Sequence, residues 1–280
     1  MAIKVVSKPD RYLISVQQSK ALTPYLPLYI TFTLPNFPPN TITMPKHVVF
    51  DVVGTCVSYS AFFTSIQKVL GPRLLAHNIT PKLFGFAWME SSEREFTYLS
   101  ISSRYKPYKH VFSTMFYRML WMSGIDNPRA FATDAERDEM VKSYSDLELR
   151  EGVKEAFAAL REAGFTVWCL TTGDVERVHG YFTRGGVDFP IENFRSCDGL
   201  GVAKPALAAY KPLYESFGDE EKWFAAAHYW DVSAAKIVGF KGAYCSVYEK
   251  EDCKELFDVD MDVMADTLPE MAQKIIEASK

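Results

Sequence analysis

The spacing of apolar residues changes part-way along the chain. Between residues 59 and 146, apolar and aromatic side chains recur at helical spacing, as in Val111, Met115 and Met119. This pattern predicts a run of amphipathic helices. After residue 147, short apolar runs of strand length alternate with amphipathic segments such as residues 151–164. Strands that alternate with helices predict a parallel sheet with right-handed crossovers.

These patterns predict an α/β fold, in which a Rossmann-like parallel sheet core is interrupted after its first strand by an inserted all-helical cap. The core comprises residues 45–58 and 147–280, and the cap comprises residues 59–146. The expected strands cover residues 47–50, 165–170, 191–197, 222–227 and 242–247, and the expected core helices cover residues 151–164, 232–238 and 268–279. An aromatic stripe such as that of the cap is more often core than a cofactor site.

Residues 1–44 differ from the rest of the chain. Prolines at positions 24, 27, 35, 38 and 39 interrupt the apolar run of this segment. The run is far shorter than the roughly 20 residues that a membrane-spanning helix needs, and we expect no signal peptide. We therefore expect an N-terminal extension that is poorly ordered, and no membrane partner.

The composition is that of a soluble globular protein. Of the 280 residues, 48% are hydrophobic and 24% are charged, and the formal net charge is −4. This charge argues against a nucleic-acid partner, because such proteins carry a basic surface. The five cysteines show no CxxC or Cys/His metal spacing. We interpret them as reduced thiols, and we expect a cytoplasmic protein.

Residues 47–55 carry the first chemical signal. Four residues of mostly apolar, β-branched character lead into Asp51, and Gly54 and Thr55 follow. The pattern predicts a buried strand that delivers Asp51 to a crevice, where α/β sheets bind their ligands. Gly54 allows a sharp turn, and Thr55 offers a hydroxyl to the carboxylate. A strand that simply ends in a turn is the alternative, because Asp and Gly are common there.

Polar side chains also follow the other expected strands. Taken alone, Thr171 or Asp174 would be a helix cap, and Asp231 would be a charge at the start of a helix. Lys204 alone would be a solvated lysine and His228 a core histidine. Because parallel strands end at one edge of a sheet, these groups together predict covalent catalysis by a carboxylate. The converging residues are Asp51, Thr55, Thr171, Thr172, Lys204, His228 and Asp231.

The order of these motifs resembles the haloacid dehalogenase (HAD) superfamily. The motifs are FDVVGT at residues 50–55, LTTG at 170–173, KP at 204–205 and HYWD at 228–231. The resemblance extends from Pro45 to the C-terminus and is closest to the type II 2-haloacid dehalogenase branch. It implies a HAD fold with a helical cap and a hydrolase of a small organic substrate. Several members of the family form dimers, so the resemblance implies a homodimer as one possible assembly.

The resemblance implies a metal-free mechanism with an ester intermediate and no cofactor. Asp51 would be the nucleophile that attacks an electrophilic carbon, and Lys204 would keep it ionised. Asp231, helped by His228, would position or activate the water that hydrolyses the ester. A carbon–halogen bond, or a similar bond, would be cleaved.

Other residues would orient the nucleophile or bind the substrate. Thr55, Thr171 and Thr172 offer hydrogen bonds. Tyr210 resembles a family tyrosine near the substrate carboxylate or leaving group, and Trp88 resembles a tryptophan of the cap.

One departure concerns the substrate carboxylate. In the family, an arginine follows the cap tryptophan and binds this carboxylate. Here Trp88 is followed by Met89 and Glu90, and Arg94 or Arg104 on neighbouring turns are the candidates to replace the cation. The guanidinium of arginine is not easily replaced in carboxylate recognition. A substrate without a carboxylate, one that is larger and more apolar, or one without a halogen is therefore an alternative.

Two departures bear on the alternative functions. A Mg²⁺-dependent phosphatase of the superfamily would carry carboxylates where this chain has Val53 and Ala227. Mg²⁺ needs hard oxygen ligands, so the phosphatase alternative is disfavoured. It is the one alternative that would need Mg²⁺ as a cofactor. A binding or biosynthetic protein that uses the same pocket is the other alternative. The charge arrangement of Asp51, Lys204 and Asp231 argues against a pure binder.

Overall fold

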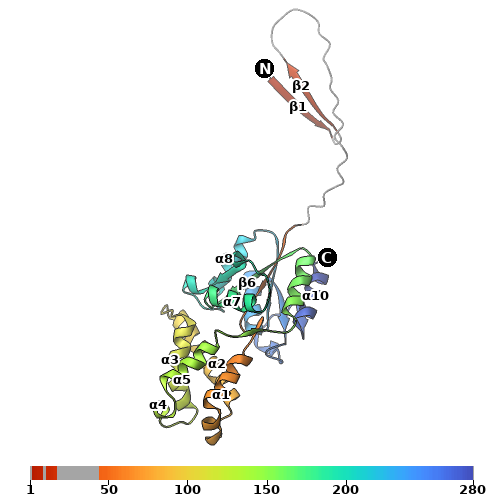
Figure 1. Ribbon diagram of the computed structural model, residues 1–280. Helices are drawn as coiled ribbons and strands as arrows, with labels where there is room; N and C mark the ends of the chain where they lie inside the picture. The colour runs from red at the N-terminus through yellow and green to blue at the C-terminus, as the bar shows by residue number, and fades with distance from the viewer. Residues whose placement is uncertain (1, 9–10, 18–43, 280) are drawn as a thin grey trace, which may run out of the picture. The chain divides into compact units, whose positions relative to one another are not determined.

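The computed structural model describes residues 2–8, 11–17 and 44–279. It divides into two units, Met1–Ile42 and Thr43–Lys280. In the first unit, β1 (Ala2–Lys8) and β2 (Arg11–Gln17) pair antiparallel (Figure 1). Most of the extension that we expect to be poorly ordered lies outside the described residues, so this expectation stays a prediction. No helix in the described part of the chain is long and apolar enough to cross a membrane.

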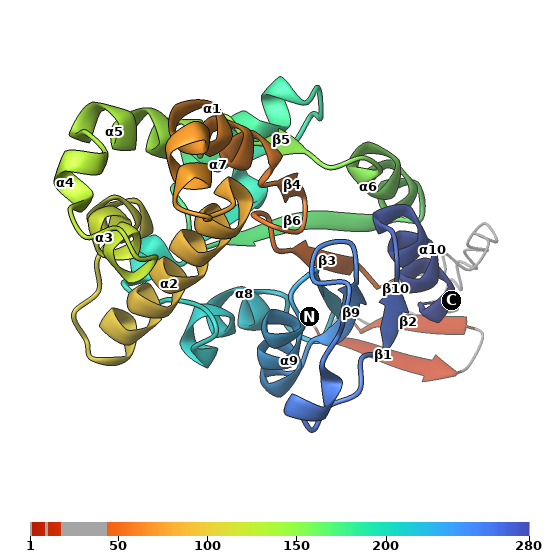
Figure 2. The same ribbon diagram turned by 90° about the horizontal axis from the view of Figure 1, so that it is seen from below.

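A six-stranded sheet forms the centre of the second unit (Figure 2). Its order is β10-β9-β8-β3-β6-β7, and neighbouring strands pair in parallel. The predicted α/β core is therefore confirmed, with β3 in its middle. The strands are β3 (Lys46–Phe50), β6 (Phe165–Thr171), β7 (Phe194–Ser196), β8 (Glu221–Ala226), β9 (Lys241–Cys245) and β10 (Val263–Ala265).

Helices cover both faces of this sheet. They are α6 (Val153–Glu162), α7 (Val175–Arg184), α8 (Lys211–Ser216), α9 (Tyr229–Val238) and α10 (Leu268–Ala278). Val48 and Phe50 of β3 share a hydrophobic cluster with α6, α7 and α10, whereas Val49 shares the other cluster with α8 and α9. Successive side chains of a strand point to opposite faces. A central strand that is covered on both sides is therefore apolar along its length.

Helices follow β3 before the chain returns to the sheet, as the sequence predicts. The insertion contains α1 (Ser60–Ala76), α2 (Pro81–Ile101), α3 (Tyr108–Met122), α4 (Pro128–Phe131) and α5 (Asp134–Ser143). A short antiparallel pair, β4 (Val57–Ser58) and β5 (Glu148–Leu149), flanks it. These two-residue strands are too short to leave a hydrophobic pattern, and the sequence did not predict them. We keep residues 59–146 as the proposed boundaries of the cap.

Aromatic side chains form the interior of the insertion. The Trp88 indole stacks on Phe112 with ring centroids 4.3 Å apart, and Phe62 contacts both rings. Trp88 Nε1 donates a hydrogen bond to the Phe112 carbonyl at 2.8 Å. This part of the aromatic stripe seen in the sequence is thus packing, which joins α1, α2 and α3.

Two element boundaries near the strand ends differ from expectation by three residues. The segment expected as a strand over residues 191–197 begins with a helical turn, because the Asn193 N–H donates to the Pro190 carbonyl, and it pairs with β6 from Phe194. Helix α9 begins at Tyr229, three residues before the expected start, with His228 at its N-cap. The short 3₁₀ helices are η1 (Ile191–Asn193), η2 (Asp198–Leu200), η3 (Leu207–Ala209) and η4 (Lys254–Leu256).

Candidate active site

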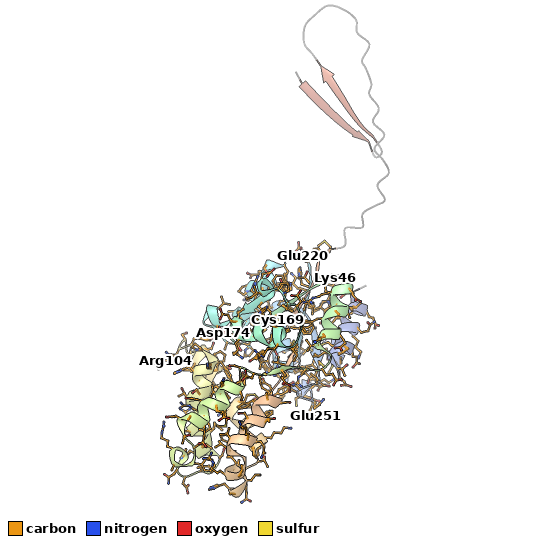
Figure 3. The ribbon with its side chains drawn as sticks, in the orientation of Figure 1. Lys46, Arg104, Cys169, Asp174, Glu220 and Glu251 are labelled. Carbon is orange, nitrogen blue, oxygen red and sulfur yellow. The ribbon has the colours of Figure 1, made fainter. Side chains whose placement is uncertain are left out.

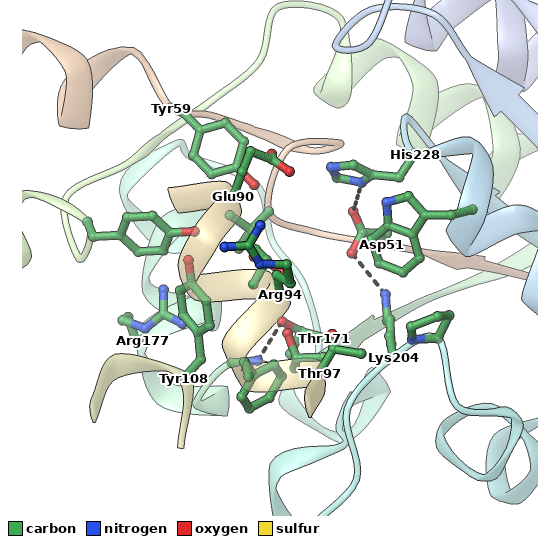
Figure 4. A pocket seen from close by; sticks show the side chains of 18 residues that line it. Asp51, Tyr59, Glu90, Arg94, Thr97, Tyr108, Thr171, Arg177, Lys204 and His228 are labelled. Atoms are coloured by element: carbon green, nitrogen blue, oxygen red, sulfur yellow. Dashed lines mark hydrogen bonds and ion pairs between the residues drawn. The ribbon is translucent and has the colours of Figure 1, made fainter. Parts of the chain in front are cut away.

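Asp51 directly follows the central strand β3. Its backbone N–H donates to the Ala225 carbonyl at 3.0 Å, which extends the contact between β3 and β8 by one residue. Thr55 Oγ1 donates to Asp51 Oδ2 at 2.7 Å. Lys204 Nζ donates to Oδ1 at 2.9 Å (Figure 4). Both oxygens of this buried carboxylate are therefore held in place.

The turn after β3 shapes the surroundings of Asp51. Thr55 Oγ1 also accepts a hydrogen bond from the Ala227 N–H at 2.8 Å, so the hydroxyl links the ends of two strands. Gly54 has φ of 92°, a conformation that favours glycine. A Cβ at this position would lie 2.5 Å from His228 Cε1. Glycine therefore leaves the space in which the imidazole lies beside Asp51.

Lys204 joins two buried carboxylates. Its Nζ lies 2.9 Å from Asp51 Oδ1 and 2.8 Å from Asp231 Oδ2. Burial alone would lower the pKa of Lys204, but Asp231 and Asp51 raise it well above its ordinary value. Burial alone would raise the pKa of Asp51, but Lys204 and His228 hold it well below its usual range. Asp51 is therefore an ionised carboxylate at neutral pH.

Asp231 and Tyr210 lie behind Lys204, and neither lines the cavity next to Asp51. Asp231 is fully buried, and burial raises its pKa. Its oxygens accept hydrogen bonds from Lys204 Nζ and from the Tyr210 hydroxyl. Neither side chain reaches the cavity in this geometry, and the expected roles of Asp231 toward the water and of Tyr210 toward the substrate stay predictions. Because α9 begins at Tyr229, Asp231 lies in its first turn and contacts Lys204.

His228 lies on the Thr55 side of the Asp51 carboxylate. Its Nδ1 is 3.3 Å from Asp51 Oδ2, which is an ion-pair contact without the alignment of a hydrogen bond. Burial alone would lower the pKa of His228, but Asp51 raises it above its ordinary value. His228 also lines the cavity. It is thus a titratable group that can reach both Asp51 and a bound molecule.

A cavity of about 310 Å³ contains the exposed edge of Asp51, Lys204 and His228 (Figure 4). It lies between the helical insertion and the carboxyl edge of the sheet, which is where α/β folds bind ligands. The residues of α2 that line it are Glu90, Glu93, Arg94, Phe96 and Thr97. Three tyrosines from residues 59–146 also line it, namely Tyr59, Tyr108 and Tyr144.

The expected substrate-binding residues divide into two groups. Thr171 and Thr172 line the cavity, and Thr171 Oγ1 accepts a hydrogen bond from the Gly173 N–H at 3.0 Å. Trp88 does not line the cavity, because its fully buried indole packs on Phe112 inside the insertion. This geometry favours a packing role for Trp88, and its expected contact with the substrate stays a prediction.

The cavity also contains charged residues that the motifs did not identify. Of the two candidate cations, Arg94 lines the cavity, whereas Arg104 is exposed outside it (Figure 3). Arg177 of α7 and Glu93 also line it, and burial raises the pKa of Glu93 to about 7. The helical spacing of Glu90, Glu93 and Arg94 was a usable signal. Arg177 had none, because its place depends on how α7 packs.

The donor set beside Asp51 does not fit Mg²⁺. Val53 and Ala227 offer no side-chain oxygen, and the carboxylate of Asp231 is bonded to Lys204. Mg²⁺ prefers oxygen ligands in octahedral geometry, usually including carboxylates. Within the described residues, no group of three or more His, Cys, Asp or Glu side chains could hold a metal ion.

A known protein family matches most of the folded unit. The family described as haloacid dehalogenase-like hydrolase matches residues 45–239. The chain belongs to this family. The matched part of this haloacid dehalogenase-like chain contains β3, the helical insertion and the residues around Asp51, Lys204 and Asp231.

Two curated relatives are dehalogenases. The chain is 31% identical to haloacetate dehalogenase H-2 of Moraxella sp. (strain B) over 111 residues, which are 39% of this chain and 50% of the relative. It is 24% identical to (S)-2-haloacid dehalogenase 4A of Burkholderia cepacia over 106 residues, 37% of this chain and 46% of the relative. The chain thus spans about half the length of the curated relatives it matches.

Solved structures share the fold. An L-2-haloacid dehalogenase superposes with a TM-score of 0.71 at 17% identity, covering 84% of this chain and 100% of the other. The L-2-haloacid dehalogenase of Xanthobacter autotrophicus gives 0.67 at 17% identity, with 83% and 98% covered. A HAD-hydrolase of Bacillus subtilis bound to magnesium gives 0.59 at 14% identity, with 84% and 100% covered. The structures that share this fold thus include L-2-haloacid dehalogenases and a hydrolase bound to magnesium, so the fold alone does not identify the chemistry.

Proposed function

We propose that this chain is a metal-independent hydrolase that releases halide from a small 2-halo acid through an ester on Asp51. One observation carries the proposal: an ionised carboxylate lies at the edge of a cavity and is held by Lys204 and Thr55. Such a group is an activated nucleophile. The two curated relatives are a haloacetate dehalogenase and a 2-haloacid dehalogenase, which supports the class of substrate.

In the first step, an oxygen of Asp51 attacks the carbon that bears the halogen. A C–O ester bond forms while the carbon–halogen bond breaks, and the halide leaves with the bonding electron pair. Lys204 keeps Asp51 ionised, and the Thr55 hydrogen bond fixes its orientation. Halide leaves as an anion and needs no proton. The reaction therefore does not require an acid two residues after Asp51, where this chain has Val53.

In the second step, we assign the base to His228 rather than Asp231. Asp231 does not line the cavity, whereas His228 lines it and lies 3.3 Å from Asp51. The ester has no carboxylate charge, so the largest of the interactions that raise the pKa of His228 is lost when the ester forms. Neutral His228 then takes a proton from water as the water oxygen attacks the ester carbonyl. The bond between the Asp51 carbonyl carbon and the ester oxygen then breaks, and the leaving alkoxide takes the proton back from His228. The hydroxy acid leaves, and the new carboxyl group of Asp51 loses its proton to solvent and is again a carboxylate.

The buried residues behind the nucleophile have a positioning role in this proposal. Tyr210 and Asp231 hold Lys204 against Asp51. Lys204 supplies the positive charge that a divalent ion would supply in a phosphatase, which supports metal independence. Thr171 and Thr172 line the cavity and are proposed to bind the substrate.

Halide release from 2-chloropropionate tests the nucleophile. We expect Asp51→Asn to lower the rate by about a thousandfold or more, because nucleophile removal costs this much in other covalent enzymes. The folded state should be retained, since Asn is isosteric. Addition of a metal chelator should leave the wild-type rate unchanged. Full activity of Asp51→Asn, or Mg²⁺-dependent phosphate release from an aryl phosphate, would contradict the proposal.

The trapped intermediate tests the base. We expect His228→Gln to form the ester and hydrolyse it slowly, so that intact-protein mass spectrometry detects an adduct equal to the acid without its halide. The Asp51→Asn variant is the control and should show no adduct. Rapid turnover by His228→Gln with no adduct would move the base assignment to another residue.

A further inference from the structure

A second polar group lies at the end of the cavity away from Asp51. It consists of Tyr108 of α3 and Arg177 of α7, which both line the cavity. In Figure 4 these two side chains lie on one side of Arg94, and Asp51 and His228 lie on the other. The proposed chemistry of halide release uses neither Tyr108 nor Arg177.

The guanidinium of Arg177 is fixed at the cavity by its neighbours. It donates to the Tyr181 hydroxyl, which in turn donates to the Tyr144 carbonyl at 2.6 Å. A Cβ at Gly173 would collide with Nη2 of Arg177, so glycine gives the guanidinium its place. Among residues 44–279, no carboxylate lies within ion-pair distance of Arg177. A positioned arginine without a carboxylate partner can bind an oxyanion.

Tyr108 supplies an unused donor beside this arginine. The residue is 9% exposed, and its hydroxyl, which lies beside that of Tyr144, is buried without a partner in hydrogen-bond geometry in the described residues. A buried hydroxyl without a partner is destabilising, and a bound acceptor would remove this cost. Burial raises the pKa of Tyr108 well above its ordinary value, so the phenol stays protonated and can donate.

The charges around this end favour a carboxylate over a phosphate. A neighbouring cavity of about 520 Å³ shares Tyr108 and Arg177 with the first. Its basic residues are Lys109, Arg177 and Arg184, and its acidic residues are Asp146, Asp174, Glu176 and Asp198. The acidic residues outnumber the basic ones, and a doubly charged group is therefore disfavoured relative to a singly charged one.

The size of the cavity favours a substrate larger than a two-carbon halo acid. A volume of about 310 Å³ is at the lower end of the range of about 300–1,000 Å³ that holds drug-sized ligands. A two-carbon halo acid would leave much of it empty. We infer that the substrate is a 2-halo dicarboxylic acid whose second carboxylate binds Arg177 and Tyr108. This inference rests on the proposed function and leaves Arg94, between the two ends, to meet the first carboxylate.

Kinetics on matched substrates test the inference. We would compare 2-chloropropionate, the chain-length series 2-chlorosuccinate, 2-chloroglutarate and 2-chloroadipate, and the 5-amide of 2-chloroglutarate, which removes the second charge. We expect the best diacid to exceed 2-chloropropionate in kcat/KM by about tenfold or more, because charge-assisted hydrogen bonds contribute this order. The amide should lose most of this gain. Equal kcat/KM for the monoacid and every diacid would overturn the inference.

Variants then assign the preference to residues. Arg177→Gln should reduce the diacid preference to about twofold or less while leaving kcat/KM for 2-chloropropionate within about threefold, since a charge pair that one substrate lacks cannot affect it. Tyr108→Phe should reduce the preference partly. Arg104→Gln, an exposed arginine outside the cavity, is the matched control and should change neither substrate. An equal loss on both substrates in Arg177→Gln would overturn the inference.

Binding of glutarate, which has no halogen, separates this inference from the proposed function. Calorimetry should detect glutarate binding to the wild type and to Asp51→Asn, and at least about tenfold weaker binding to Arg177→Gln. If no acid releases halide but glutarate binding depends on Arg177, the subsite stands and the dehalogenase function fails. If monoacids are turned over and glutarate does not bind, the inference alone fails. Binding of inorganic phosphate in place of glutarate would also overturn it.

Discussion

Glu93 shows how position changes the chemistry of a single residue. It lines the cavity on α2, and burial raises its pKa from 4.5 to about 7. His228, Glu90, Asp51 and Lys204 are the charged groups that act on it. Near neutral pH its ionisation adds a negative charge to a cavity that is proposed to bind an anion, and such a charge opposes binding.

The pH dependence of activity therefore tests the role of Glu93. We expect kcat/KM for 2-chloropropionate to fall several-fold as pH rises through about 7. Glu93→Gln should remove this decrease, because glutamine carries no charge at either pH. Glu162→Gln, at an exposed position of α6, is the control and should keep the wild-type profile. An unchanged profile in Glu93→Gln would show that another group titrates.

The same shift has a stability counterpart. A raised pKa means that the folded state keeps a proton which the unfolded state releases between pH 4.5 and about 7. The stabilisation from this proton is fully present below pH 4.5 and is lost as pH rises through about 7. The free energy of unfolding of the wild type should fall across this window relative to that of Glu93→Gln.

At the same scale, sequence reasoning located the groups around Asp51 but not their order. The rule that parallel strands end at one edge anticipated that Asp51, Lys204 and His228 would lie together, and the structure places them within ion-pair distance. It could not tell that Asp231 lies behind Lys204 instead of facing the cavity. Asp231 lies in the first turn of α9, which begins three residues before the expected start. Boundaries are the least reliable part of a sequence-based prediction. The catalytic roles stay proposals.

Among the elements, α2 has two faces with different tasks. One face carries Trp88 into the aromatic core with Phe112 of α3. The other carries Glu93 and Arg94 to the cavity. The sequence predicted the packing face from its apolar spacing. It could not predict the cavity face, because no single-sequence pattern shows which polar side of a helix turns toward another part of the chain.

Trp88→Phe tests this division of tasks. We expect it to lower the free energy of unfolding by about 1–3 kcal/mol, because it leaves a cavity in the aromatic core and removes the hydrogen bond to the Phe112 carbonyl. The kcat/KM for 2-chloropropionate should stay within about threefold, since Trp88 does not line the cavity. Urea denaturation and steady-state kinetics on one preparation measure both. Unchanged stability with a large loss of activity would restore the substrate-binding role that the family resemblance suggested.

For the molecule as a whole, the insertion and the sheet are joined by contacts far apart in sequence. The Tyr105 hydroxyl, after α2, donates to Asp198 Oδ1 at 2.6 Å. The Ala203 N–H donates to Ser100 Oγ at 2.9 Å. Both contacts hold the segment that leads to Lys204 against the end of α2. The sequence predicted a sheet and an insertion, but such long-range pairs depend on how the two pack and left no pattern in it. The cytoplasmic location and the homodimer stay predictions.

Loosening this junction should alter substrate binding more than chemistry. In Tyr105→Phe, Asp198 loses a partner at a partly exposed site, so we expect a stability change of no more than about 1.5 kcal/mol. The end of α2 and the segment before Lys204 are then free to separate, and we expect KM for 2-chloropropionate to rise about three- to tenfold with kcat changed less than twofold. Tyr98→Phe, at an exposed position of the same helix, is the matched control. Hydrogen exchange should increase at residues 102–107 and 198–204 in Tyr105→Phe alone. Wild-type KM and exchange in that variant would mean that the junction is held by packing and that the hydrogen bond adds little to it.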